Sequence, residues 1–293
     1  MKYVKTVELV NNILQQYEVP LTLRQIFYRL VANHDYPNKN STYCQLSKQL
    51  VQARKDGIID ESMIEDRSRE FFGGDNGSKN MQEFLDSQIS NFLNSRKMFS
   101  RKLWDNQPEF VIVWIEKDAL SRVVSDVADR YSVMTAPSRG YPSYTFIKQA
   151  IKRLPLDKRT IVLHFADHDP SGLDMTRDLQ QRLSSYSIDS LRIIEVERVA
   201  LSYGQVIDYN LSPNPTKLAD PRSEEYVAEF GNQCWELDAI DPNDLQRIVK
   251  EAITKYINEK AWIQTIEEQE QEREQLQIQF SAMAKEIQKT GLL

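Results

Sequence analysis

Two carboxylates, Asp167 and Asp169, lie one residue apart directly after the apolar run of residues 161–165. The run predicts a buried strand, and Pro170 and Gly172 predict a tight turn into a helix. Ligands of open α/β sheets bind where strands end, so we expect both carboxylates to face one ligand. Their hard oxygens favour Mg²⁺ or Mn²⁺ over softer metals. For an isolated Asp-x-Asp, the alternative is a solvated turn or a helix cap.

A second apolar run, residues 110–115, ends in Glu116 and Lys117. About one βαβαβ passage separates it from the first, and parallel strands end at the same edge of a sheet. We therefore expect Glu116 to join Asp167 and Asp169 in one metal site. Lys117 is expected to stabilise negative charge there and to contact DNA.

Tyr28 is the candidate nucleophile. At about 100° per residue, the apolar face of the helix that starts at Leu23 centres between Leu23 and Phe27, and Tyr28 lies more than about 90° away. Arg24 precedes it by one turn on the same flank. A guanidinium in that place binds a phosphate with two nitrogens and favours a phenolate. The alternative is a tyrosine and an arginine that stack on the surface.

The elements around Tyr28 predict a winged helix-turn-helix. Apolar positions predict three helices, the first ended by Pro20 and the third closed by Gly57. Capping-box patterns open the second helix and the third, at Thr22 with Gln25 and at Thr42 with Gln45. A short β-wing is expected over residues 57–69.

Basic charge is concentrated in this module, although the whole chain of 293 residues carries a net charge of −6. Residues 22–55 contain six basic residues and one acidic residue, a local balance of +5. The third helix is the one that enters a DNA groove in such modules. We expect its Lys48, Arg54 and Lys55 to bind DNA together with Arg24. The alternative is an ordinary solvated helix face.

Strands and helices alternate after residue 109, which predicts a parallel sheet. The expected fold class is α/β, in a multidomain α+β chain. Residues 1–72 form the DNA-binding domain, 73–108 a linker with a bridging helix over 81–104, 109–258 the metal-binding domain, and 259–293 a C-terminal helix. That helix is expected to dock on its own chain or on a dimer mate, because its apolar heptads are too few for a long coiled coil.

Composition favours a cytoplasmic, nucleoid-associated protein without a membrane anchor. No run of 18 apolar residues and no signal-like N-terminus occurs. Cys44 and Cys234 lack zinc-type spacing, so we expect two reduced, partly buried thiols.

Together these residues resemble a known superfamily. Glu116, followed by Asp-x-Asp-Pro-x-Gly from Asp167, is similar to the Toprim domain of topoisomerases, primases and some nucleases. The segment LRQIFYRL, residues 23–30, resembles the Arg-x-x-Tyr-Tyr signature of the DNA topoisomerase VI A subunit and the related meiotic double-strand-break transesterase. The resemblance covers residues 5–240 and is greatest to the compact, stand-alone "mini-A" relatives, because the module begins near Met1.

The resemblance implies a Mg²⁺-dependent transesterase that forms a 5′-phosphotyrosyl link to double-stranded DNA. Tyr28 then takes the place of the nucleophile, and Phe27 replaces the family's first tyrosine. Tyr28 of one protomer is expected to work with the metal-binding carboxylates of the other, so that a homodimer breaks both strands. No phosphate-cradling loop is present, so strand passage would need an ATPase partner subunit.

Two alternatives stay open. The first is a hydrolytic Toprim endonuclease, in which water attacks and Tyr28 is structural. The second is a non-catalytic winged-helix DNA-binding protein, whose carboxylates only stabilise the fold. His168, which stands inside the Asp-x-Asp, is expected to be a solvent-facing spacer.

Overall fold

The computed structural model describes residues 3–17, 19–33, 35–65, 77–187, 192–217 and 219–289. The chain divides into two compact units. One comprises Met1–Arg69 with Glu109–Tyr256, and the other comprises Glu70–Pro108 with Ile257–Leu293. The N-terminal helices and the sheet therefore belong to one unit. Residues 73–76, at the start of the expected linker, lie outside the described residues.

Three helices form the N-terminal part of the first unit: α1 (Tyr3–Leu14), α2 (Leu23–Ala32) and α3 (Asn40–Lys55). Their apolar faces share one core, which includes Val10, Ile26, Leu30, Leu46 and Leu50. The capping box of Thr22 and Gln25 opens α2 as predicted. Gly57, with φ +67°, follows the end of α3, where the left-handed backbone favours glycine.

The start of α3 and the wing differ from expectation. α3 begins at Asn40 after Lys39, which makes no side-chain cap, so the predicted Thr42–Gln45 capping box is wrong. Thr42 already lies in the first turn of the helix, with its N–H bonded to the Lys39 carbonyl at 3.0 Å. In place of a wing hairpin, β1 (Leu21–Thr22) pairs in parallel with β2 (Ile64–Glu65) after the short helix η1 (Glu61–Met63). Residues 66–69 of the expected wing lie outside the described residues.

The predicted parallel α/β sheet is confirmed. Four strands lie in the order β4-β3-β5-β6: β3 (Glu109–Ile115), β4 (Met134–Pro137), β5 (Arg159–Phe165) and β6 (Ile194–Ala200). β3 and β5 occupy the centre because their runs are apolar on both faces, as a sheet with helices on both sides requires.

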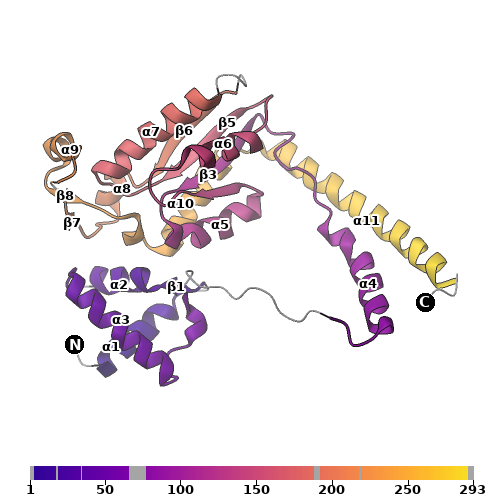
Figure 1. The fold of residues 1–293 in the computed structure, drawn as a ribbon, viewed down its shortest axis with the longest axis horizontal. Helices are drawn as coiled ribbons and strands as arrows, with labels where there is room; N and C mark the ends of the chain where they lie inside the picture. The colour runs from indigo at the N-terminus through magenta and orange to yellow at the C-terminus, as the bar shows by residue number, and fades with distance from the viewer. Residues whose placement is uncertain are drawn as a thin grey trace. The chain divides into compact units, whose positions relative to one another are not determined.

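Helices cover both faces of this sheet (Figure 1). α6 (Tyr144–Arg153) and α7 (Pro170–Ser187) pack on one face, where Trp114, Ile147 and Leu179 share a core. α5 (Ser121–Ala128), after the short helix η3 (Asp118–Leu120), packs with α10 (Pro242–Thr254) on the other face. The turn η4 (Asp129–Tyr131) leads from α5 to β4.

The register of the central strands brings their ends together. Ile115 pairs with Phe165, and the Glu116 N–H donates to the Phe165 carbonyl at 2.9 Å. Between β5 and β6 the register shifts at His164 and Phe165, which marks a bulge beside the strand end. Residues 116 and 167 therefore leave the sheet side by side.

Short elements connect β6 to α10: α8 (Tyr203–Asp208), β7 (Asn214–Pro215), α9 (Ser223–Phe230), β8 (Gln233–Cys234) and η6 (Leu237–Ala239). The apolar residues of the segment 234–240 predict an edge strand, but this prediction is largely wrong, because only β8 and one bridge at Trp235 are extended before η6 begins. Cys234 is half-buried, whereas Cys44 is exposed, against expectation.

The second unit contains α4 (Met81–Ser95), η2 (Arg96–Met98) and the 31-residue helix α11 (Glu259–Lys289). α4 ends before the predicted residue 104. Phe92 stacks on Phe280 at 4.5 Å between ring centroids, and Arg101 pairs with Glu268 at 2.5 Å and Glu272 at 2.7 Å. Among the described residues, no helix combines the length and apolar character needed to span a bilayer.

Candidate active site

Glu116 and Asp167 meet at the adjoining ends of β3 and β5. The Asp167 backbone N–H donates to Glu116 Oε2 at 3.2 Å, and Asp167 Oδ1 accepts from the Leu237 N–H at 2.8 Å. Burial, and then the charge of Asp167, raises the pKa of Glu116 to about 7. Burial also raises the pKa of Asp167, against the attraction of Lys117. The sequence-predicted pair is thus assembled, and the charge of Asp167 favours protonation of Glu116.

Asp169 does not join this pair but caps the start of α7. Its Oδ1 accepts from the Gly172 N–H at 2.6 Å and from the Ser171 hydroxyl at 2.9 Å, at the start of α7. The helix-cap alternative is therefore realised for this residue. Within the described ranges, no three His, Cys, Asp or Glu side chains are grouped so that they could hold a metal ion.

Lys117 lies inside a ring of carboxylates. Its Nζ is 3.0 Å from Asp167 Oδ1, 2.9 Å from Glu236 Oε2 and 2.9 Å from Asp238 Oδ2. Burial disfavours the ammonium, but attraction by Asp238 and Asp167 outweighs it and raises the pKa of Lys117. The expected contact of Lys117 with DNA is not what this geometry presents, because protein carboxylates already surround the ammonium.

Glu236 and Asp238 are site residues that the sequence prediction missed. Both contact Lys117, and the Asp238 side chain is 1% exposed. They form a second acidic pair separated by one residue, like Asp167 and Asp169. That spacing could have indicated a second acidic pair. It was overlooked because the pattern of residues 234–240 favours an edge strand, in which such side chains are ordinary.

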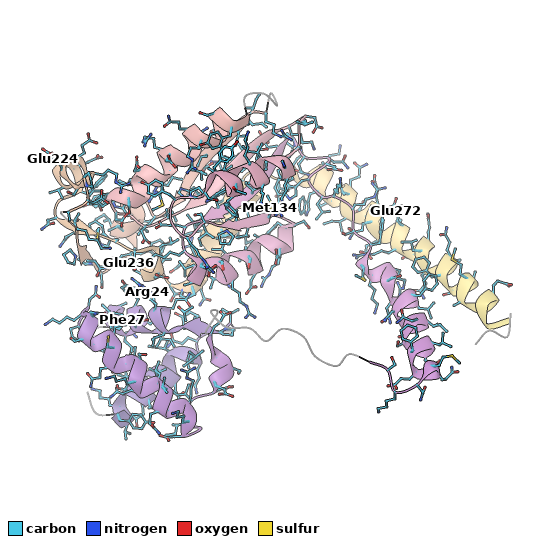
Figure 2. The ribbon with its side chains drawn as sticks, in the orientation of Figure 1. Arg24, Phe27, Met134, Glu224, Glu236 and Glu272 are labelled. Carbon is cyan, nitrogen blue, oxygen red and sulfur yellow. The ribbon has the colours of Figure 1, made fainter. Side chains whose placement is uncertain are left out.

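Arg24 connects α2 to this cluster. Its guanidinium forms ion pairs with Glu236 and, at 3.2 Å, with Asp238. Figure 2 shows Arg24 and Glu236 pointing toward each other. Burial opposes the charge, but the two carboxylates raise the pKa of Arg24 further above its ordinary value. Arg24 and the carboxylates of the sheet edge therefore meet within a single chain.

Tyr28 was expected to lie away from the buried face of α2, but it is buried. Only 5% of it is accessible, and its hydroxyl accepts a hydrogen bond from Asn214 Nδ2 at 3.2 Å. Burial and the charge of Glu236 raise its pKa, against Asn214 and Arg24. Prediction from α2 alone failed here because β7, nearly 190 residues away in sequence, supplies Asn214.

A cavity of about 190 Å³ brings these groups to one opening. Tyr28, Arg24 and Glu236 line it together with Lys39 and Tyr43. It is large enough for a phosphate group, and it offers two cationic side chains and two phenols.

The basic residues predicted on α3 divide into two sets. Lys48 and Lys55 are exposed, whereas Arg54 is partly buried. Arg54 lines a second, larger cavity of about 690 Å³ together with Arg24 and Arg139. This cavity also carries Glu65 and Asp118, so its charge is mixed.

His168 contradicts the expectation of a solvent-facing spacer. It is 2% exposed, because rings from residues 203–235 enclose it. Those rings are distant in sequence, so the local pattern at 167–169 does not reveal them.

No protein-family model and no curated protein matches this chain. The chemistry therefore rests on the side chains themselves. A paired carboxyl with a raised pKa suits proton transfer, an arginine suits phosphate binding, and a phenol is a nucleophile when it loses its proton. These groups lie at the ends of β3 and β5 and on the facing side of α2.

Proposed function

We propose that this chain is a Mg²⁺-dependent DNA-cleaving transesterase that resembles a topoisomerase VI A subunit, with a winged helix followed by a Toprim-type domain. The observation that carries the proposal is the convergence of Tyr28 and Arg24 on one cavity, with Arg24 joined to the carboxylates through Glu236. Lys117 continues the connection to Asp167. A nucleophile, a phosphate-binding group and acidic groups are the parts that phosphodiester transesterification needs.

The carboxylates at the sheet edge fit a hard divalent cation by their chemistry. Glu116, Asp167 and Asp169 offer only oxygen donors, and burial together with the charge of Asp167 raises the pKa of Glu116. When bound, Mg²⁺ would neutralise the phosphate and the leaving oxygen. Asp169 would have to contribute Oδ2 or share the Oδ1 that now caps α7.

In the proposed reaction, the Tyr28 oxygen forms a bond to phosphorus as the bond from phosphorus to the 3′-oxygen breaks. The products are a 5′-phosphotyrosyl link and a free 3′-hydroxyl. The phenolic proton passes from Tyr28 to solvent water, and the 3′-oxygen gains a proton. Glu116 is suited to donate that proton, because its pKa is raised to about 7. Arg24 binds the phosphate oxygens in place of Glu236.

Lys48, Arg54 and Lys55 are proposed to bind the backbone of double-stranded DNA. A homodimer with two such sites would break both strands, and the exchange of Tyr28 between chains stays a prediction. Strand passage would require energy from an ATPase partner.

The test is a trapping assay with supercoiled DNA and Mg²⁺. After denaturation, we expect linear DNA with covalently attached protein, and proteinase should release it. Tyr28→Phe should abolish the adduct while it costs at most about 1.5 kcal/mol of stability, since one hydrogen bond is lost. Tyr43→Phe, which removes a hydroxyl from the same cavity, is the matched control and should retain the adduct. A Tyr28→Phe protein that still forms the adduct excludes Tyr28 as nucleophile.

A hydrolytic endonuclease is the second candidate. The burial of Tyr28 and its raised pKa favour it, because both hinder formation of a phenolate. In this case water attacks, and the products carry free 5′-phosphates without attached protein. Tyr28→Phe would then cleave DNA as the unaltered protein does, whereas Glu116→Gln would not.

A further inference from the structure

His168 is buried in the middle of the acidic strand end. Its Nδ1 lies 2.9 Å from the Tyr226 hydroxyl, and that hydroxyl donates to the His168 carbonyl at 2.9 Å. The ring is 2% exposed, so its role lies in the residues that it holds together.

Four aromatic rings surround His168. The distances between ring centroids are 4.7 Å to Phe230, 5.6 Å to Tyr226, 5.7 Å to Tyr203 and 5.9 Å to Trp235. The rings come from α8, α9 and the residue after β8, so they fasten the 203–235 segment to the end of β5.

The backbone reinforces this attachment. The His168 N–H donates to the Trp235 carbonyl at 2.8 Å, and the Trp235 N–H donates back at 2.9 Å. The bridge is antiparallel, which sets Glu236 across from Asp167. One residue later, the Leu237 N–H donates to Asp167 Oδ1 at 2.8 Å.

We infer that His168 is a positioning residue that, with its aromatic neighbours, brings the second acidic pair, Glu236 and Asp238, to the first. Lys117 contacts both acidic pairs. Its ammonium pairs with Asp167 on one strand of the bridge and with Glu236 and Asp238 beyond the other strand. The inference rests on the proposed function only because the same carboxylates and Lys117 form the proposed active site.

The test measures how fast an amine-acetylating reagent modifies Lys117, by mass spectrometry of peptides. Lys148, whose Nζ bonds the Tyr186 carbonyl at 2.9 Å, serves as the internal reference. In His168→Ala, we expect the ratio of Lys117 to Lys148 modification to rise about tenfold, as local opening becomes easier. His168→Phe keeps a ring in the enclosure and should hold the ratio within about threefold of the unaltered protein.

His164→Ala is the matched control. His164 is also a buried histidine on β5, 2% exposed, but it bonds Thr176 rather than the 226–238 segment. Its loss should destabilise the fold and leave the ratio unchanged. If His168→Ala does not fold, Tyr226→Phe removes the hydroxyl that joins the ring and the carbonyl, and we expect a rise of about threefold.

An unchanged ratio in folded His168→Ala, or an equal rise in His164→Ala, overturns the inference. Neither result depends on DNA cleavage. A protein that forms no adduct but shows the rise in His168→Ala would refute the proposed transesterase and retain His168 as a positioning residue. A protein that forms the adduct but shows an unchanged ratio in His168→Ala would support the transesterase and refute the positioning role of His168.

Discussion

Replacing Lys117 with methionine tests how the acidic cluster is stabilised. The substitution keeps an unbranched apolar stem but removes a charge that lies 2.9–3.0 Å from three carboxylates. Removing one partner of a buried ion pair costs about 3–5 kcal/mol. Because Lys117 retains 18% exposure, we expect the lower value, about 3 kcal/mol. For a unit of this size, the melting temperature should fall by roughly 6–12 °C.

Thermal unfolding followed by circular dichroism at pH 7 measures this loss. Lys148→Met is the control, because its ammonium bonds a carbonyl and should cost about 1 kcal/mol or less. The cost comes from unpaired carboxylate charge, so it should be present near neutral pH and should shrink at about pH 3, where carboxylates are largely protonated. Added Mg²⁺ should restore part of the loss, since a cation can take the place of the ammonium.

An equal melting temperature for Lys117→Met and the unaltered protein at pH 7 would refute this reasoning. So would a loss of the same size at both pH values. The first result would mean that the carboxylates are already neutral or hydrated, and the second that lost packing rather than charge is responsible.

Two further predictions concern the same edge of the sheet. The pKa of Glu116 is raised from 4.5 to about 7, so the folded state binds more protons over that interval and its stability should fall as pH rises through it. Glu116→Gln should remove this part of the slope and make the protein more stable at pH 8, as urea unfolding at pH 5 and pH 8 would show; an unchanged slope would contradict it. Gly172→Ala would place a Cβ 2.1 Å from the Asp167 carbonyl oxygen, so we expect a loss of at least about 1–3 kcal/mol. In Gly204→Ala the nearest atom is 3.9 Å away, and its urea midpoint should change little; equal losses would exclude the steric cause.

The sheet was predictable because its signals are local. The runs that form β3 and β5 are apolar throughout, and a parallel order follows from the helices between them. The pairing of Glu116 with Asp167 then follows from strand ends at a common edge. The capping box at Thr22 was equally local, since both partners lie within one turn.

The errors occur where distant residues decide the outcome. His168 is buried by rings that lie 35 or more residues away, and Asn214 covers a tyrosine that α2 alone would leave exposed. The partners of Lys117 were missed because Glu236 and Asp238 lie 119 and 121 residues away, and its contact with DNA stays a prediction. Thr42 failed as a cap because α3 starts after Lys39 instead.

The charges at the sheet edge do not balance. Five carboxylates gather there with three cations, Lys117, Arg24 and Arg198, an excess of two negative charges when all are ionised. A polyanion that approaches such an edge is repelled until a counter-ion arrives. For the proposed reaction this imposes an order of assembly, in which the divalent ion enters first and the nucleic acid second. A chelator added before DNA should then prevent DNA from binding at this edge. A chelator added after DNA has bound should act more slowly, because it must remove the ion from the protein–DNA complex.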